Sequence, residues 1–309
     1  MKIGLIDVDG HNFPNLALMK ISAYHKAKGD TVEWCIPLDK YDIVYQAKVF
    51  DETYTSDIDW IPQADKVIKG GTGYGLDNKL PDEIEHIYPD YSIYGELTAD
   101  TAFGYLSRGC PRGCPFCVVA EKEGRRSYKV ADLSEFWNGQ KFIQILDPNI
   151  LACRDHPDLL QQLIDSKAYV NFNQGLDIRF TTEANIPLLN QVKKKEIHFA
   201  WDNPKDDLLP YFERYKALAS RKYNNAYAMV YCLVNYNSTM EENLYRIYTL
   251  RDLGYAPFVM VYDKPNAPLE IKKLQRWCNN KFVFKKVARF EDYDTRVKTP
   301  RKKEGPQND

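Results

Sequence analysis

Five short apolar stretches decide the fold of this chain: FIQIL at residues 142–146, YVNF at 169–172, IHFAW at 197–201, AMVYCLV at 228–234 and FVMVY at 258–262. Each is rich in β-branched or aromatic residues, which is typical of a buried strand. With one more candidate near residue 101, the expected strands begin near residues 101, 142, 169, 196, 225 and 256. A strand with its following helix takes about 30 residues, so this spacing predicts a repeated βα array.

Helical segments are expected to follow most of these strands, at residues 156–167, 181–194, 205–222, 239–253 and 267–279. A closed βα barrel has eight units and needs about 250 residues. Only six units fit between residues 96 and 290. We therefore expect this region to form a six-unit (β/α) partial TIM barrel.

Residues 1–95 show a separate α/β pattern, with a helix expected over 14–28 because Pro14 suits its start and Gly29 its end. This alternation predicts a flavodoxin-like parallel sheet domain. Its expected strands are Lys2–Val8, Thr31–Ile36, Ile43–Phe50 and Lys66–Lys69.

Charge and hydropathy narrow the class of protein. The 309 residues include 42 basic and 43 acidic side chains, so no global field steers the chain towards nucleic acid or acidic membranes. The longest apolar run, Ala226 to Val234, is half the length of about 18 residues that a membrane span needs. Asp7 and Asp9 interrupt the only early apolar stretch, which argues against a signal peptide. We expect a cytoplasmic protein with no membrane partner.

The last stretch, residues 291–309, has no apolar period and holds five arginine and lysine side chains. This composition predicts a basic, solvated and disordered tail. The alternative is a segment that contacts nucleic acid or an acidic partner.

Three of the seven cysteines crowd into one loop, CPRGCPFC, at Cys110, Cys114 and Cys117. The loop follows the first expected barrel strand directly, where a βα barrel keeps its catalytic groups. Three thiolates on a tight loop suit a 4Fe–4S cluster and leave one iron open to a ligand such as S-adenosylmethionine. The alternative is structural zinc with Cys153 or a histidine as fourth ligand, but no second half-site of the usual spacing appears.

With this loop, the aromatic Phe116 before its third cysteine and the six-unit array, residues 101–290 resemble the radical S-adenosylmethionine superfamily. The resemblance implies that Cys110, Cys114 and Cys117 bind the cluster and that the backbone around Phe116 touches adenine. It also implies reductive cleavage of S-adenosylmethionine to a 5′-deoxyadenosyl radical. The substrate would be a small molecule or a nucleotide or RNA, and the electron donor a protein such as a flavodoxin or ferredoxin.

Polar residues follow the expected strands, and a barrel places its reacting groups at these carboxyl ends. They are expected to bind S-adenosylmethionine and substrate, although each also suits a helix cap or turn, and Asp177 with Arg179 suits a local ion pair. Two family motifs are replaced here: Asp147-Pro148-Asn149 stands where a Gly-Gly-Glu-like turn is usual, and Tyr231–Ser238 where GxIxGxxE is usual. The candidate side chains are Asp147, Asn149, Asn173, Gln174, Asp177 and Asn235.

The front domain is similar to the cobalamin-binding domains of many radical S-adenosylmethionine enzymes. Their DxHxxG motif aligns with Asp9 to Pro14, with Pro14 in place of glycine, and Gly70-Gly71 stands where a later glycine pair is usual. The resemblance implies His11 as a cobalt ligand. The alternative is a degenerate domain in which Gly70 to Gly73 form a tight turn or an anion nest.

These observations lead to one main hypothesis, a radical S-adenosylmethionine enzyme of unknown reaction. If cobalamin binds, radical methylation is the implied chemistry. The alternatives from other classes are a non-catalytic zinc protein that contacts nucleic acid and an electron-transfer or scaffolding protein that keeps the cluster without turnover.

Overall fold

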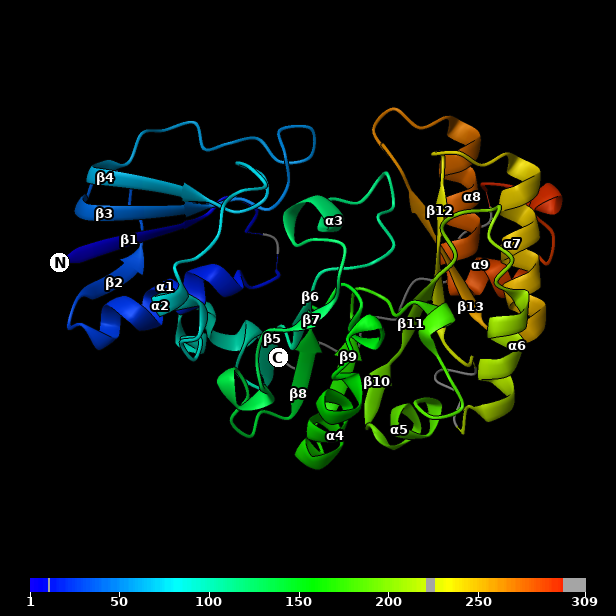
Figure 1. Ribbon diagram of the computed structural model, residues 1–309. Helices are drawn as coiled ribbons and strands as arrows, with labels where there is room; N and C mark the ends of the chain where they lie inside the picture. Colours follow the sequence, from blue (N-terminus) through cyan, green and yellow to red (C-terminus); the bar gives the residue numbers. More distant parts are fainter. Residues whose placement is uncertain (11, 221–225, 297–309) are drawn as a thin grey trace, which may run out of the picture. The chain divides into compact units, whose positions relative to one another are not determined.

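The computed structural model describes residues 1–10, 12–220 and 226–296, and for residues 195 and 196 the backbone alone. The chain divides into two compact units, Met1–Gln174 with Gln191–Lys195, and Gly175–Asn190 with Glu196–Asp309. Each unit has helices packed on parallel strands (Figure 1), which confirms the mixed α/β class. The domain boundary near residue 95 stays a prediction, and most of the basic tail lies outside the described residues.

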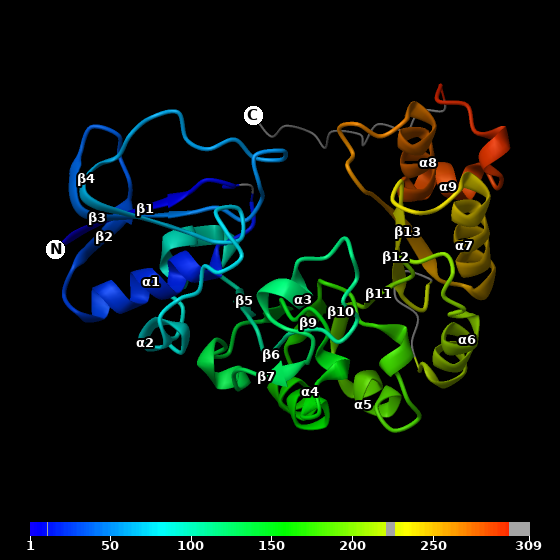
Figure 2. The same ribbon diagram turned by 45° about the horizontal axis from the view of Figure 1, so that its top comes forward.

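The amino-terminal sheet of the first unit has four parallel strands in the order β2-β1-β3-β4. The chain passes from β1 to β2 on one side and then to β3 on the other side of β1. Helix α1 (Leu16–Ala27) covers one face of this sheet (Figure 2), where Leu18 packs with Ile3. Asn15, rather than Pro14, caps the helix by accepting a hydrogen bond from the Leu18 amide. The strands are β1 (Lys2–Asp7), β2 (Thr31–Trp34), β3 (Lys40–Ala47) and β4 (Gln63–Gly70).

The second sheet of the first unit has the order β10-β9-β8-β5. Its β5–β8 and β8–β9 pairs are parallel, and their register puts Gly104 beside Ile145 and Ile145 beside Phe172. Three strands therefore end at one edge of the sheet, and the segments that leave them start close together. The strands are β5 (Thr101–Gly104), β8 (Phe142–Ile145), β9 (Tyr169–Phe172) and β10 (Lys194–Glu196).

Short elements and one longer helix connect these strands. An antiparallel pair, β6 (Ser107–Arg108) and β7 (Tyr128–Lys129), encloses the cysteine loop and α3 (Val119–Lys122). The remaining elements are α2 (Asp82–Glu85), η1 (Tyr91–Leu97), η2 (Leu133–Glu135), η3 (Ile150–Ala152) and α4 (His156–Ser166).

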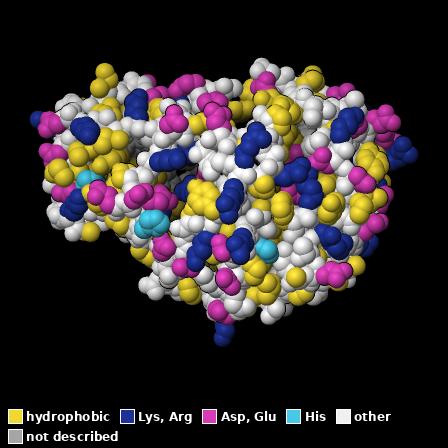
Figure 3. Space-filling view, in the orientation of Figure 1, with side chains coloured by type: hydrophobic (Ala, Val, Ile, Leu, Met, Phe, Trp, Pro, Cys, Tyr) yellow, Lys and Arg dark blue, Asp and Glu magenta, His cyan; other side chains and the backbone are white. Residues whose placement is uncertain are grey.

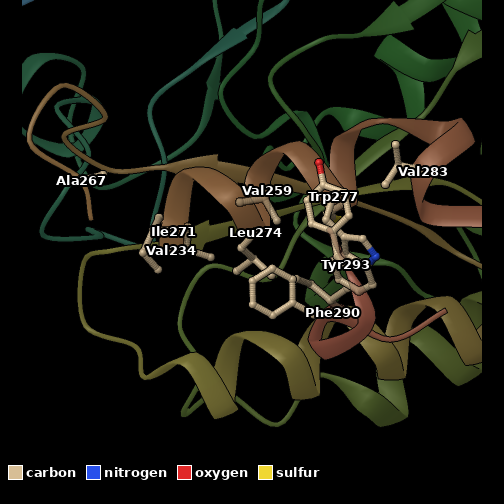
Figure 4. Close-up of a cluster of buried hydrophobic side chains, with 11 residues drawn as sticks. Val234, Val259, Ala267, Ile271, Leu274, Trp277, Val283, Phe290 and Tyr293 are labelled. Carbon is tan, nitrogen blue, oxygen red and sulfur yellow. The ribbon is translucent and has the colours of Figure 1, made fainter. Parts of the chain in front are cut away.

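The second unit has a parallel three-stranded sheet in the order β11-β12-β13, with α7 and α8 packed against it. Trp277 and Leu274 of α8 are completely buried with Val259 of β13 and Val234 of β12 (Figure 4). The elements are β11 (His198–Ala200), β12 (Met229–Val234), β13 (Ala256–Val261), η4 (Ile178–Phe180), η5 (Phe290–Asp292), α5 (Ile186–Gln191), α6 (Leu209–Leu218), α7 (Met240–Leu253), α8 (Leu269–Asn279) and α9 (Lys281–Lys286).

Most predicted elements are found, although the helix expected over 205–222 is shorter, at Leu209–Leu218, and two further regions differ. The strand expected near residue 196 is divided into β10 and β11, and the expected start of the next strand at 225 lies outside the described residues. The helix expected over 181–194 is shorter and is found as α5, with Thr182 and Asn185 forming a capping box just before it. Each side chain of that pair accepts a hydrogen bond from the other residue's amide, which satisfies amide groups at the start of the helix.

Candidate functional site

The cysteine loop starts from a backbone position that only glycine can occupy. Gly109 has a φ of +80°, and a Cβ atom there would lie 2.1 Å from the carbonyl oxygen of Arg126. The next amide, of Cys110, donates to the Gly124 carbonyl at 3.2 Å. The amide of Cys117 donates to the Cys114 carbonyl at 3.0 Å and closes a turn at the far end of the loop. Both ends of the loop are therefore held by main-chain hydrogen bonds.

Glu123 holds the residues just before the first cysteine. Its Oε2 accepts from the Gly109 amide at 3.0 Å, and its Oε1 accepts from the Arg108 guanidinium at 2.8 Å. Arg108 also reaches Glu85 at 3.2 Å and lies over the ring of Tyr105. Sequence reasoning missed Glu123 because no spacing pattern pairs a helix-end carboxylate with an amide fourteen residues earlier.

The three cysteines lie on this loop, with Cys110 and Cys114 half-buried and Cys117 exposed. The buried side chain of Asn149, just after β8, donates to the Cys110 sulfur across 3.6 Å, and its Oδ1 has no hydrogen-bond partner among the described residues. Within residues 1–10, 12–220 and 226–296, no three His, Cys, Asp or Glu side chains come close enough together to hold a metal ion. The structure thus brings Asn149 to Cys110 but does not gather the three sulfur atoms.

The donor chemistry of the loop still fits the cluster that the resemblance implies. Three sulfur ligands come from one loop, and one of them accepts an amide hydrogen bond of the kind that stabilises a ligating thiolate. Half-buried Phe116 lies on the same loop.

Asp147, the other polar residue after β8, is 5% exposed and fastens the start of the loop to the sheet. One oxygen accepts from the Leu106 amide at 2.8 Å, and the other accepts from the amide and hydroxyl of Ser107 at 2.6 and 2.5 Å. Burial raises the pKa of Asp147 to about 7, although these three hydrogen bonds oppose the shift. These bonds occupy the carboxylate within the protein, and contact with S-adenosylmethionine stays a prediction for this residue.

Asn173 and Gln174 directly follow β9, at the edge where β5 and β8 also end. Asn173 is half-buried and Gln174 is exposed. The register therefore groups them with Asp147 and Asn149 as the polar residues that follow two neighbouring strands, β9 and β8.

The other two candidate residues belong to the second unit and have local structural roles there. Asp177 accepts from the Arg179 guanidinium at 2.7 and 3.0 Å and from the Arg179 amide at 3.1 Å, which confirms the local ion pair. Arg179 also pairs with Asp206. Asn235 has a φ of +64°, and its amide donates to the Tyr262 carbonyl at 2.8 Å. This bond ties the ends of β12 and β13 together.

Arg246 is a completely buried residue that sequence reasoning missed. Its guanidinium donates to the carbonyl oxygens of Trp201 and Asp202 at 2.6 and 2.9 Å, to that of Leu233 at 2.9 Å and to the Asn243 side chain at 2.7 Å. It thereby joins the carboxyl ends of β11 and β12. The available sequence signal was helical spacing, because Arg246 lies three residues after Asn243 and both fall on one face of α7. In the structure this face is buried.

Asp202 lies beside this guanidinium and accepts a hydrogen bond from the Leu233 amide at 3.3 Å. Burial raises the pKa of its carboxyl to about 6, although Arg246 opposes the shift.

The front-domain residues give a local explanation for the glycine pair. Gly71 has a φ of +96°, and a Cβ atom there would lie 2.3 Å from the Lys48 carbonyl oxygen, so the turn requires glycine for chain packing. His11, the implied cobalt ligand, lies outside the described residues. Cobalamin binding therefore stays a prediction.

Comparison with known proteins assigns no family. Neither a protein-family model nor a curated protein matches this chain. None of the helices among the described residues has the length and apolar character that crossing a bilayer requires.

Proposed function

We propose that the chain is a radical S-adenosylmethionine enzyme whose cluster is held by Cys110, Cys114 and Cys117. The observation that carries the proposal is a loop of three thiols leaving the edge where the parallel strands β5, β8 and β9 end together. Parallel βα folds keep their reacting groups at this edge. The proposal includes a finer fold, in which the strands from β5 to β13 form a six-unit partial barrel and the amino-terminal sheet is a flavodoxin-like domain.

Each group of residues has a distinct role in this proposal. The cysteines supply the sulfur ligands, and Asn149 donates to the first of them. Asp147 and Glu123 hold the backbone that enters the loop. When the loop closes around the cluster, we expect only the middle of the loop to move. When bound, the cluster supplies the electron that splits the sulfur–carbon bond of S-adenosylmethionine.

Two further contacts to S-adenosylmethionine are proposed. Asn173 and Gln174 offer amide groups at the strand ends to its amino acid part or ribose. The backbone around Phe116 contacts its adenine, as the resemblance implies.

The surface around the loop supports an acidic electron donor, such as a flavodoxin or ferredoxin. Arg112, Arg125 and Arg126 are all exposed, and lysine and arginine side chains gather over α3, β6 and β7 in Figure 3. Complementary charge steers such encounters and makes them sensitive to salt. The proposed substrate is a small molecule or a nucleotide or RNA.

Anaerobic reconstitution with iron and sulfide tests the proposal. We expect brown protein that dithionite bleaches and that forms 5′-deoxyadenosine from S-adenosylmethionine. Cys114→Ala should lose both properties, while Cys35→Ala, a matched change outside the loop, should keep them.

A colourless protein with stoichiometric zinc would contradict the proposal and favour the non-catalytic alternative. A cluster without 5′-deoxyadenosine formation would favour an electron-transfer role. Methyl transfer that depends on added cobalamin would extend the proposal to a radical methyltransferase.

A further inference from the structure

A cavity of about 450 Å³ lies at the carboxyl ends of β1 and β2 in the first unit. Its walls come from the segments after β1, from the end of β2, from the β3–β4 connection and from η1. In an open parallel sheet, ligands bind outside the carboxyl ends of the strands, where the chain reverses its direction of winding. Here the winding reverses between β1 and β3, so the cavity borders this point through the end of β1. The cavity also has the size of small-molecule sites.

Aromatic rings from four residues contribute to the lining of this cavity. Phe13, Trp34, Trp60 and Tyr94 all contribute, and Phe13 and Trp34 are 46% and 39% exposed. The indole of Trp34 is held in place, because its Nε1 donates to the Ile93 carbonyl at 3.0 Å and its ring meets that of Tyr94 at 5.1 Å. Fixed aromatic faces that remain exposed are suited to stacking on a flat ligand.

Among the described residues of the lining, the only charged side chain is acidic. Asp7 is the acidic residue in it, and no lysine or arginine is among the described residues that form the walls. Asp7 accepts from the Tyr94 hydroxyl at 2.6 Å and from the Gly10 amide at 3.3 Å. A carboxylate has about four acceptor positions, so these two bonds and a further backbone hydrogen bond from Asp9 still leave capacity for a ligand donor. Burial raises the pKa of Asp7, although its hydrogen bonds with Tyr94 and Gly10 oppose the shift.

We propose that this cavity binds a planar, nitrogen-containing aromatic ligand that carries a positive charge and no phosphate. The ring would stack on Trp34 and Trp60, and its nitrogen-bound hydrogens would donate to Asp7. Aromatic faces and a carboxylate both attract a cation, whereas an anion would meet no lysine or arginine among the described residues of the lining. The inference is independent of the proposed cluster, since it uses none of the loop residues.

Benzamidine and benzoate, which match in shape and differ in charge, provide the test on purified full-length protein. We expect benzamidine to shift the side-chain indole signals of Trp34 and Trp60 in ¹H–¹⁵N spectra, with a dissociation constant below about 10 mM. Benzoate should bind at least tenfold more weakly. No shift with benzamidine, or equal binding of the two probes, would overturn the proposal.

Two variants locate the site. Asp7→Asn should weaken benzamidine binding about tenfold or more, while Asp39→Asn, a matched change at an exposed carboxylate that pairs with Lys2, should leave it unchanged. Because Asp7 is half-buried and hydrogen-bonded within the protein, Trp34→Ala is a second test at a more exposed position, and it should weaken binding while Trp34→Phe restores most of it. Unchanged affinity in Trp34→Ala overturns the proposal, and so does a loss of binding in Cys114→Ala.

Discussion

Asn149 donates its side-chain amide to the sulfur of Cys110, with 3.6 Å between nitrogen and sulfur. The two residues are 39 positions apart and follow different strands. The parallel register of β5 and β8 brings them together, so the sheet itself positions a donor on the first cysteine of the loop. Asn149 is 2% exposed, which protects this bond from competition with water.

Removing this donor should lower the reduction potential of the proposed cluster. The hydrogen bond stabilises negative charge on the sulfur ligand, and that charge increases on reduction. We therefore expect Asn149→Ala to shift the midpoint of an anaerobic redox titration to a more negative value. Asn171→Ala, which removes a bond to Gln144 within the sheet, is the matched control. Equal midpoints for Asn149→Ala and wild type would show that the bond does not tune the cluster.

Glu123→Gln should destabilise the entry to the loop. The substitution removes the charge that pairs with Arg108 and leaves one acceptor where the Gly109 amide and Arg108 now use two. Hydrogen bonds to charged groups contribute about 1.5–3 kcal/mol each, so we expect a loss of about 2 kcal/mol in the free energy of unfolding. Urea unfolding measures it. Glu121→Gln, at an exposed position of the same helix, should cost under about 0.5 kcal/mol.

Asp147 should make stability depend on pH. Its pKa is raised to about 7 in the folded state, above its ordinary value, so the folded protein binds more protons than the unfolded chain between about pH 4 and pH 7. Stability should therefore decrease as the pH rises through this window, by up to about 4 kcal/mol from this group.

Comparing unfolding at pH 5 and pH 8 checks the contribution of Asp147. Asp147→Asn should remove the pH-dependent part, although it also disturbs the bonds to Ser107, and the exposed Asp158→Asn should keep it. If the free energy of unfolding changes equally with pH in wild type and Asp147→Asn, the pH dependence belongs to another group.

Arg246→Leu should be the most damaging of these changes. It leaves the carbonyl oxygens of Trp201, Asp202 and Leu233 buried without their donor. We expect the free energy of unfolding to decrease by about 3–5 kcal/mol, as observed when one partner of a buried polar network is removed. Arg251→Leu, near the end of the same helix and partly exposed, is the control and should cost much less. Similar losses for the two variants would argue against the special role of Arg246.

Local sequence patterns were sufficient to predict several strands, one ion pair and the cysteine loop. The apolar runs at 142–146 and 169–172 predicted β8 and β9 because strand formation depends on neighbouring residues. The ion pair of Asp177 with Arg179 was also readable, since two positions separate the partners. The spacing of Cys110, Cys114 and Cys117 identifies a shared loop in the same way.

Only the tertiary structure decided which distant groups meet. The contacts of Asn149 with Cys110, of Asp147 with Ser107 and of Tyr94 with Asp7 join residues 39, 40 and 87 positions apart. Such contacts depend on strand order and register, which residues along the whole sheet set together. No local sequence period predicts these contacts. For the same reason, the aromatic cavity beside Asp7 could not be predicted from the sequence.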